Sequence, residues 1–356
     1  MEQNWPKKHS YLANAMEFLY PAQNLSHSDT VLRRARSLGI FPSVHEWAKT
    51  KWGEIPHCFE QEHWHSIARR KWLSLSIKHI LRDFPDVPCV LLKGALWGEQ
   101  FYSHSQYRES SDIDLLLRVN DMPLVEKHLE SLGYHRVDGS RDWASNQHAF
   151  FHEGGRAPVE LHWQLAPPPL PQPPIDLCLE LSTPHPLYPK FLSLAGHYVY
   201  LHMILHAMQH WGALKPILDL IAFWDSGVDD WEKLHEFAKS YHLEKGSLFF
   251  ALVVSLIARR PHPLSCQNHV LYALAKRYVQ RFEAVLVQSS PWRENTRLVW
   301  GEDSHAQAAK GVLERSFSMF LIDDRRQACQ AFSRVLLDGP HFIGRLFHQG
   351  LSAISS

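Results

Sequence analysis

Short apolar runs of the kind that form β-strands are concentrated in one part of the chain, between Cys89 and Leu165. The run CVLLKG closes at Gly94, which is typical of a strand followed by a turn. Four more runs of strand length follow it. They are Ile113–Val119, Tyr134–Val137, His148–His152 and Pro158–Trp163.

Helical spacing of apolar residues appears between these strands, over Ala95–Tyr102 and over Met122–Leu132, where Gly133 supplies a C-terminal cap. Strands and helices that alternate in this way predict an α+β fold, with helices packed on a small mixed sheet.

Helical periodicity also lies on both sides of this central unit. Before it, His63–Leu81 is the clearest example. After it come six predicted helices, namely Phe191–Trp211, Leu214–Trp224, Trp231–Tyr241, Gly246–Arg259, Asn268–Val287 and Lys310–Phe320. A proline-rich stretch beginning APPPLPQPP predicts a stiff connector. We therefore divide the chain into a helical N-terminal region (1–88), a core (89–165), a connector (166–189) and a helical C-terminal domain (190–356).

Composition narrows the class of protein without naming a function. Lys and Arg together number 37, as do Asp and Glu, so no overall charge indicates a nucleic-acid or membrane surface. Five scattered cysteines without a CxxC motif argue against a disulfide framework and a zinc finger. No apolar run reaches the roughly 20 residues of a membrane span, and the first residues lack a signal peptide pattern. We expect a cytoplasmic protein with no membrane partner.

Two acids open the second predicted strand, in the segment YRESSDIDLLLRVN. Alternation along a strand places Asp112 and Asp114 on one face, about 7 Å apart, with Leu116 beside them. Two carboxylates in that position repel each other unless a cation lies between them. Mg²⁺ suits such a site, because it binds through one or two carboxylates together with substrate phosphates.

A later predicted strand offers a third acid. In PVELHWQL, Glu160 and His162 share one face while the apolar side chains take the other. If this strand lies beside the strand of Asp112 and Asp114, three carboxylates converge. Such a set can hold two metal ions for in-line displacement at phosphorus.

The turn before the first predicted helix has the features of a phosphate site. Gly94 lets the backbone approach an anion, and the following helix offers free N–H groups. Lys93 adds a positive charge, and Arg108 could form a bidentate clamp on a phosphate.

These motifs together resemble a known superfamily. LLKG at Leu91–Gly94, R-x-S-x-D-I-D at Arg108–Asp114 and VELHW at Val159–Trp163 look like the nucleotidyltransferases related to DNA polymerase β. Within it, the chain is most similar to bacterial proteins with a Lys-Gly motif, a group related to toxin nucleotidyltransferases of abortive-infection systems. The similarity covers roughly Cys89 to Pro261.

The resemblance implies transfer of a nucleoside monophosphate from an NTP, with ATP the expected donor, and release of pyrophosphate. Asp112 and Asp114 would bind two Mg²⁺ ions, and Glu160 would hold the one that activates the acceptor oxygen. Lys93 and Gly94 would lie at the triphosphate, while Arg108 and Ser110 belong to the motif.

The chain departs from the superfamily pattern at two positions. Ala95 replaces the usual Ser or Gly after Gly94, which removes a hydroxyl that contacts phosphate. Glu160 stands where Asp is frequent, which adds one methylene to that ligand.

A histidine stripe marks the helix that follows the connector. His202, His206 and His210 are spaced four residues apart and share one helix face. They could bind zinc, line the nucleotide or acceptor cleft through His206 and His210, or be satisfied by ordinary neighbours. Asp219, on the next helix, is an acid in an apolar segment and needs a partner, for which Lys215 or a histidine of the stripe could serve, unless it faces substrate.

Three other functions remain open from the sequence. The same site could carry kinase-like phosphotransfer onto a peptide or small molecule, or act on tRNA ends as a toxin. A non-catalytic nucleotide-binding protein could also retain this fold. The acceptor, whether small molecule, protein or tRNA, is not specified by any motif.

Overall fold

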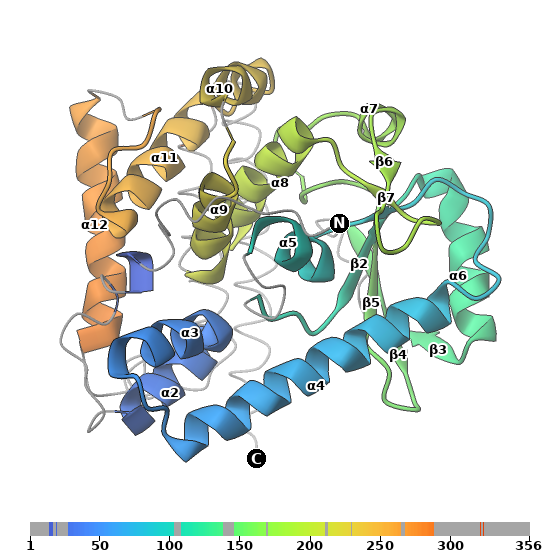
Figure 1. The fold of residues 1–356 in the computed structure, drawn as a ribbon. Coiled ribbons are helices and arrows are strands. Elements are labelled where there is room, and N and C mark those ends of the chain that lie inside the picture. Colours follow the sequence, from blue (N-terminus) through green and yellow to red (C-terminus); the bar gives the residue numbers. More distant parts are fainter. Residues whose placement is uncertain are drawn as a thin grey trace, which may run out of the picture.

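A computed structural model places one mixed sheet between layers of helices (Figure 1). It describes residues 14–16, 19, 28–102, 108–137, 146–168, 170–210, 213–228, 230–264, 268–287, 321 and 323. The helix predicted at Lys310–Phe320 lies outside these residues.

The described residues form a seven-stranded sheet in the order β3-β4-β5-β2-β1-β7-β6. The β2–β5 and β1–β7 pairs are parallel and the others are antiparallel, which confirms the predicted α+β class. The strand bounds are β1 Val90–Leu91, β2 Ile113–Leu116, β3 Tyr134–Arg136, β4 Gln147–His152, β5 Val159–His162, β6 Thr183–Pro184 and β7 Leu192–Ser193.

The sheet extends beyond the predicted core. Strand β6 lies within the stretch expected to be a connector, and β7 lies just after it. Pro184 is tolerated there because β6 is an edge strand, where a missing N–H breaks no inner ladder. The short helix α7 (Ile175–Glu180) precedes β6.

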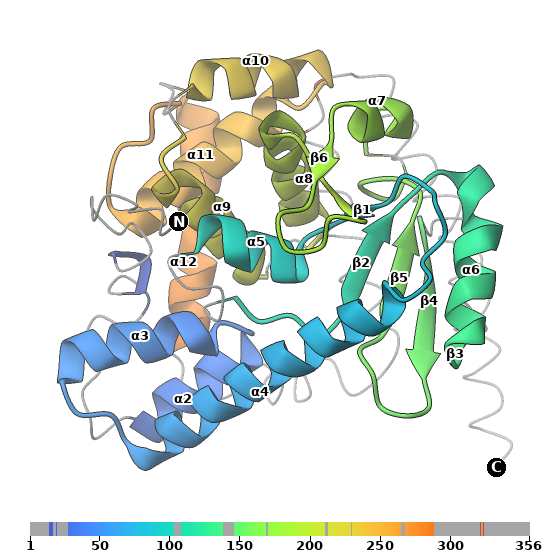
Figure 2. The ribbon, with the colours of Figure 1, turned by 45° about the vertical axis from the view of Figure 1, so that its right-hand side comes forward.

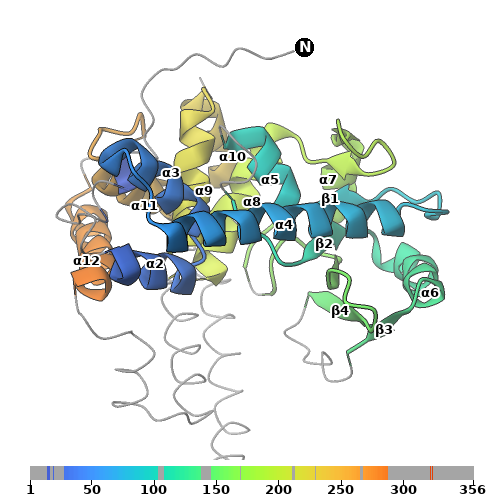
Figure 3. The same ribbon diagram turned by 60° about the horizontal axis from the view of Figure 1, so that its bottom comes forward.

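The remaining helices surround the sheet close to where sequence periodicity predicts them. The N-terminal ones are α2 Ser28–Ser37, α3 Phe41–Trp52 and α4 His57–Ile80. Those of the central unit are α5 Gly94–Phe101, the 3₁₀ turn η3 Val119–Asp121 and α6 Met122–Ser131. The C-terminal ones are α8 Gly196–Gln209, α9 Lys215–Asp225, α10 Trp231–Ser240, α11 Glu244–Ala258 and α12 His269–Val287. Helix α4 runs from α2 and α3 to the sheet (Figure 3). Every helix of the described residues is too short or too polar to cross a bilayer.

Alternating side chains of the central strands belong to two separate hydrophobic cores, one on each face of the sheet. Leu115 and Leu117 pack on one face with α4 and α6. Leu116 and Val90 pack on the other face with α5 and α8, and Figure 2 shows the strands between these two groups of helices. The second core continues into residues of α2, α3 and α9–α12, so the N-terminal and C-terminal helices share one apolar interior. Asp114 projects toward this shared core, on the face of Leu116.

A buried ion pair joins the central unit to the C-terminal helices. Arg108 Nε and Nη2 donate to the two carboxylate oxygens of Asp219 on α9, at 2.7 and 2.9 Å. The Tyr102 hydroxyl donates to the same carboxylate at 2.8 Å. Asp219 is fully buried, and the side chains that hydrogen-bond to it are Arg108 and Tyr102. Lys215 lies near enough for the charge of Asp219 to act on it. Sequence spacing could not reveal a partner 111 positions away.

Loss of this pair should cost much more stability than loss of an exposed one. Asp219→Asn keeps the side-chain shape but leaves the Arg108 charge buried without its counter-charge, so we expect a loss of about 3–5 kcal/mol in the free energy of unfolding. The matched control is Asp176→Asn, which removes an exposed partner of Arg118 and should cost at most about 1 kcal/mol. Urea unfolding measures both. Equal losses would show that the Arg108–Asp219 pair does not hold the two parts together.

Candidate active site

The Lys93-Gly94 turn has a strained backbone. Lys93 has φ +34° and ψ −135°, and Gly94 has φ +37°. A side chain at positive φ is costly, and such residues concentrate at functional sites. A Cβ added at Gly94 would lie 2.7 Å from Ser110 Oγ, so only glycine lets this turn approach the next segment of the motif.

Ser110 connects the turn to the first acid. Its Oγ lies 3.2 Å from both the backbone oxygen and Oδ1 of Asp112, to either of which it can donate. Asp112 directly precedes β2 and is partly exposed. The serine of the motif therefore orients an acid as well as filling the space that Gly94 leaves.

Two of the three predicted acids, Asp114 and Glu160, lie side by side, and Asp112 lies near enough for their charges to act on it. Strands β2 and β5 are parallel neighbours, and their register sets Asp114 opposite Glu160. Asp114 is buried, whereas about a quarter of the Glu160 side chain (26%) is exposed. Burial and then the nearby charges of Asp114 and Glu160 raise the pKa of Asp112. The charges of Asp114 and Glu160 thus add to burial in opposing the ionisation of Asp112, and a nearby cation would relieve this.

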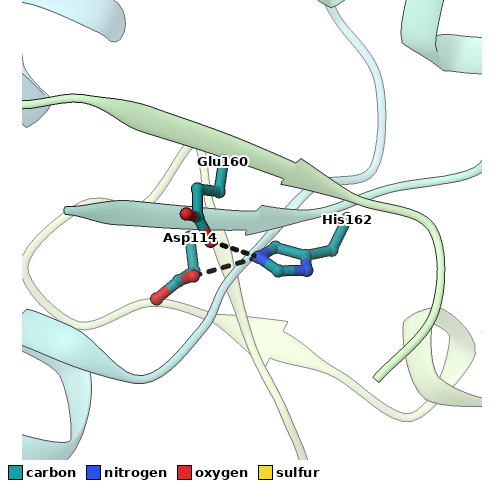
Figure 4. Close-up of side chains that lie close together, drawn as sticks. All are labelled: Asp114, Glu160 and His162. Carbon is teal, nitrogen blue, oxygen red and sulfur yellow. Dashed lines mark hydrogen bonds and ion pairs between the residues drawn. The ribbon is translucent and has the colours of Figure 1, made fainter. Parts of the chain in front are cut away.

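Two basic side chains already lie against the central acid, and Figure 4 shows one of them, His162, between Asp114 and Glu160. Lys93 Nζ is 3.2 Å and His162 Nε2 is 3.0 Å from Asp114 Oδ1. Burial favours the neutral acid, but Lys93 and His162 outweigh it and hold the pKa of Asp114 below its usual range. His162 Nε2 is also 3.4 Å from Glu160 Oε2. Burial would lower the pKa of His162, but its hydrogen bonds to Asp114 and Glu160 raise it.

His162 is a site residue to which sequence reasoning assigned no role. The available signal was its position two residues after Glu160, on the same face of the strand. Ligand atoms of Asp114, Glu160 and His162 lie within 4.8 Å of one another. Within the residues that the structure describes, these three side chains form a group that could hold a metal ion. The histidine stripe is not part of this group. The carboxylates suit Mg²⁺, and the imidazole widens the choice of ion.

The histidine stripe lies on the Lys93 side of the site. His202 is buried on α8, with its ring centroid 5.2 Å from that of Trp97, and His206 lies 6.1 Å from the same ring. Burial and then the charge of Lys93 lower the pKa of both histidines well below the usual value, so they are neutral near pH 7. Among the described residues, neither ring nitrogen of His202 has a hydrogen-bond partner. His210 is exposed at the end of the helix.

The N-terminal region also reaches the site. Arg69 of α4 pairs with Glu109 at 3.8 Å, next to Arg108 in the chain. A Cβ added at Gly39, between α2 and α3, would lie within 4.0 Å of both Glu109 and Lys215. Burial and the nearby Arg108 lower the pKa of Lys215 to about 8, so it is still mostly charged at pH 7. The sequence placed Lys215 only as a partner for Asp219.

The close approach at Gly94 gives a specific prediction. Gly94→Ala should destabilise the protein by about 1–3 kcal/mol, because the added Cβ meets Ser110 Oγ at a position that is already strained. Gly155→Ala is the matched control, since Gly155 also has a positive φ (+70°) but nothing within 4 Å of its added Cβ.

The double variant Gly94→Ala/Ser110→Ala should recover the part of the loss caused by the contact, because the Ser110 Cβ at 3.5 Å and the Asp112 backbone oxygen at 3.6 Å, both at ordinary contact distance, are then the nearest atoms. Thermal unfolding of the three variants measures this. If Gly94→Ala behaves like Gly155→Ala, the turn is not constrained by Ser110.

Comparison with known proteins agrees with this geometry. The model of a family described as uncharacterised nucleotidyltransferase matches residues 24–259, a range that includes every site residue named above. No curated protein matches the chain.

Proposed function

This chain belongs to the uncharacterised nucleotidyltransferase family, and we propose that it transfers a nucleoside monophosphate from an NTP, with ATP as the expected donor, to an acceptor hydroxyl. The observation that supports this proposal is the pairing of Asp114 with Glu160 beside Lys93, with Asp112 near enough for their charges to act on it. Pyrophosphate is the other product.

The donor set fits divalent cations. In this proposal Asp112 and Asp114 hold two Mg²⁺ ions and Glu160 holds the one nearer the acceptor, as the resemblance to the superfamily implies. Bound there, the ions would neutralise charge on the reacting phosphate and make the acceptor oxygen more nucleophilic. The raised pKa of Asp112, caused by burial and then by the charges of Asp114 and Glu160, supports this arrangement.

The protein itself positions the triphosphate. The first amide groups of α5 point out of the turn at Gly94 and are free to bind an anion. Lys93 now neutralises Asp114. A cation at the carboxylates would take over that task, which frees the ammonium group of Lys93 for the β- and γ-phosphates.

In this proposal Arg108 stabilises the turn at Gly94. This role differs from the phosphate clamp expected from the sequence. Its bidentate bond to Asp219 uses Nε and Nη2, and Nη1 donates to the carbonyl oxygen of Gly94 at 3.3 Å. The guanidinium also stacks on Trp97, 5.2 Å from the ring centroid. With three of its five N–H groups committed to the fold, Arg108 fixes the orientation of the Gly94 carbonyl.

Helix α8 carries two further candidates for contact with the nucleotide. His206 is neutral near pH 7 and its ring centroid lies 6.1 Å from that of the buried Trp97. His210 is exposed at the end of the helix. We propose that His206 and His210 contact the nucleotide here.

Transfer is tested directly with the purified full-length protein, Mg²⁺ and each of the four NTPs labelled at the α-phosphate. Small molecules, total tRNA and protein from a lysate serve as three separate acceptor fractions. Label should enter one fraction, and the product mass should increase by an NMP. The same fractions are also incubated with NTPs labelled at the γ-phosphate. If only these label an acceptor, the transfer is kinase-like and the proposal is contradicted.

The carboxylates supply the second test. Asp112→Asn, Asp114→Asn and Glu160→Gln should each lower the transfer rate by about 10²-fold or more, because each removes charge from the cation site. Glu153→Gln is the matched control, since Glu153 is exposed on the surface and pairs with the exposed His135. Circular dichroism checks folding. Near-normal transfer by a folded Asp114→Asn protein would refute the assignment.

A further inference from the structure

One nitrogen atom occupies an unusual place among the carboxylates. His162 Nε2 lies 3.0 Å from Asp114 Oδ1 and 3.4 Å from Glu160 Oε2, and the histidine is 3% exposed (Figure 4). It is the third member of the group whose ligand atoms converge within 4.8 Å. A metal site built only from acids would have no nitrogen at this position.

We propose that His162 is a direct ligand of the cation held between Asp114 and Glu160, and that this position prefers a first-row transition-metal ion such as Mn²⁺ to Mg²⁺. The inference rests on the proposed function only in placing a cation between these carboxylates. It adds a ligand to that site and names the class of ion that the ligand selects.

The backbone presents His162 for this role. It lies at the end of β5, opposite Leu116 of β2, and its side chain therefore emerges on the face that carries Asp114 and Glu160. All three side chains come from two hydrogen-bonded strands, which hold ligands more firmly than loops do. A neutral imidazole can carry its proton on Nδ1, which leaves the Nε2 lone pair free for a metal.

The competing role for His162 is to donate a hydrogen bond that orients the acids. A single N–H has one hydrogen, so Nε2 cannot make two well-aligned hydrogen bonds to Asp114 and Glu160 at once. Asp114 also has Lys93 as a neutralising partner, at 3.2 Å. A cation at the centre of the three ligand atoms satisfies the nitrogen and both carboxylates together.

The nitrogen determines which ion is favoured. Mg²⁺ is hard and selects oxygen ligands in near-ideal octahedral geometry. Imidazole suits first-row transition metals, whose affinity for mixed N and O sites rises from Mn²⁺ onward along the series. One imidazole with two carboxylates therefore shifts the preference away from Mg²⁺ without excluding it.

The test is to bind Mn²⁺ to the full-length protein without nucleotide and to record pulsed electron paramagnetic resonance spectra. A directly bound histidine couples its ¹⁴N nucleus to the Mn²⁺ electron spin, and we expect this coupling in the wild type. We also expect Mn²⁺ to bind at least about tenfold more tightly than Mg²⁺, as measured by competition.

Three variants separate the possibilities. His162→Gln should lose the ¹⁴N coupling and weaken Mn²⁺ binding by about 10-fold or more. His135→Asn is the matched control, because it removes an exposed histidine of β3 that the site does not use and should leave the coupling intact. Asp114→Asn should abolish Mn²⁺ binding. Labelling histidine alone with ¹⁵N should remove the ¹⁴N signal from the wild type even if His162→Gln does not fold.

Each outcome decides one question. Mn²⁺ that binds, depends on Asp114 and shows no histidine ¹⁴N coupling overturns the ligand role of His162 but leaves the proposed transferase function intact. Coupling that survives in folded His162→Gln assigns the nitrogen to another histidine and also overturns the proposal. Mn²⁺ binding that does not depend on Asp114 removes the cation site itself, and with it the metal basis of the proposed function.

Discussion

The parallel pairing of β2 with β5 is the constraint on which the site depends. Its register puts Asp114 directly opposite Glu160, on the inner face of a covered sheet. Like charges in that position destabilise a sheet. The structure compensates with Lys93 and His162, both within hydrogen-bonding distance of the same carboxylate oxygen. A shift of one residue in this register would turn Glu160 to the other core and dismantle the site.

A second constraint ties the helices to the sheet. The Arg108–Asp219 pair is buried, and Arg108 also holds the carbonyl of Gly94. The turn that is proposed to bind phosphate is therefore fixed by a residue of α9. The apolar core also runs from the N-terminal helices through α8 to α12, so the helical regions share one interior with the strands of the candidate site. A change in α9 at Asp219 can thus alter the Gly94 turn through Arg108.

Local features of the site were readable from the sequence. Alternation with a period of two predicted that Asp114 and Glu160 each lie on the strand face opposite to the apolar side chains. The pattern of a strand followed by a turn located Gly94. Contacts between distant segments were not readable, because no periodicity encodes them. The Arg108–Asp219 pair spans 111 positions, and His162 acquires its role only when β5 lies beside β2. The last two strands are two residues each, too short for alternation to show.

The central claim is that the carboxylates of β2 and β5, with the acid that precedes β2, form the cation site beside which a nucleotide binds. Crystals soaked with Mn²⁺ and a non-hydrolysable NTP analogue test it most directly, because Mn²⁺ scatters anomalously. The account predicts an anomalous peak within coordination distance of Asp114 and Glu160, with the triphosphate against Lys93 and Gly94. A triphosphate bound elsewhere, or a peak away from these carboxylates in crystals that bind the analogue, would contradict it.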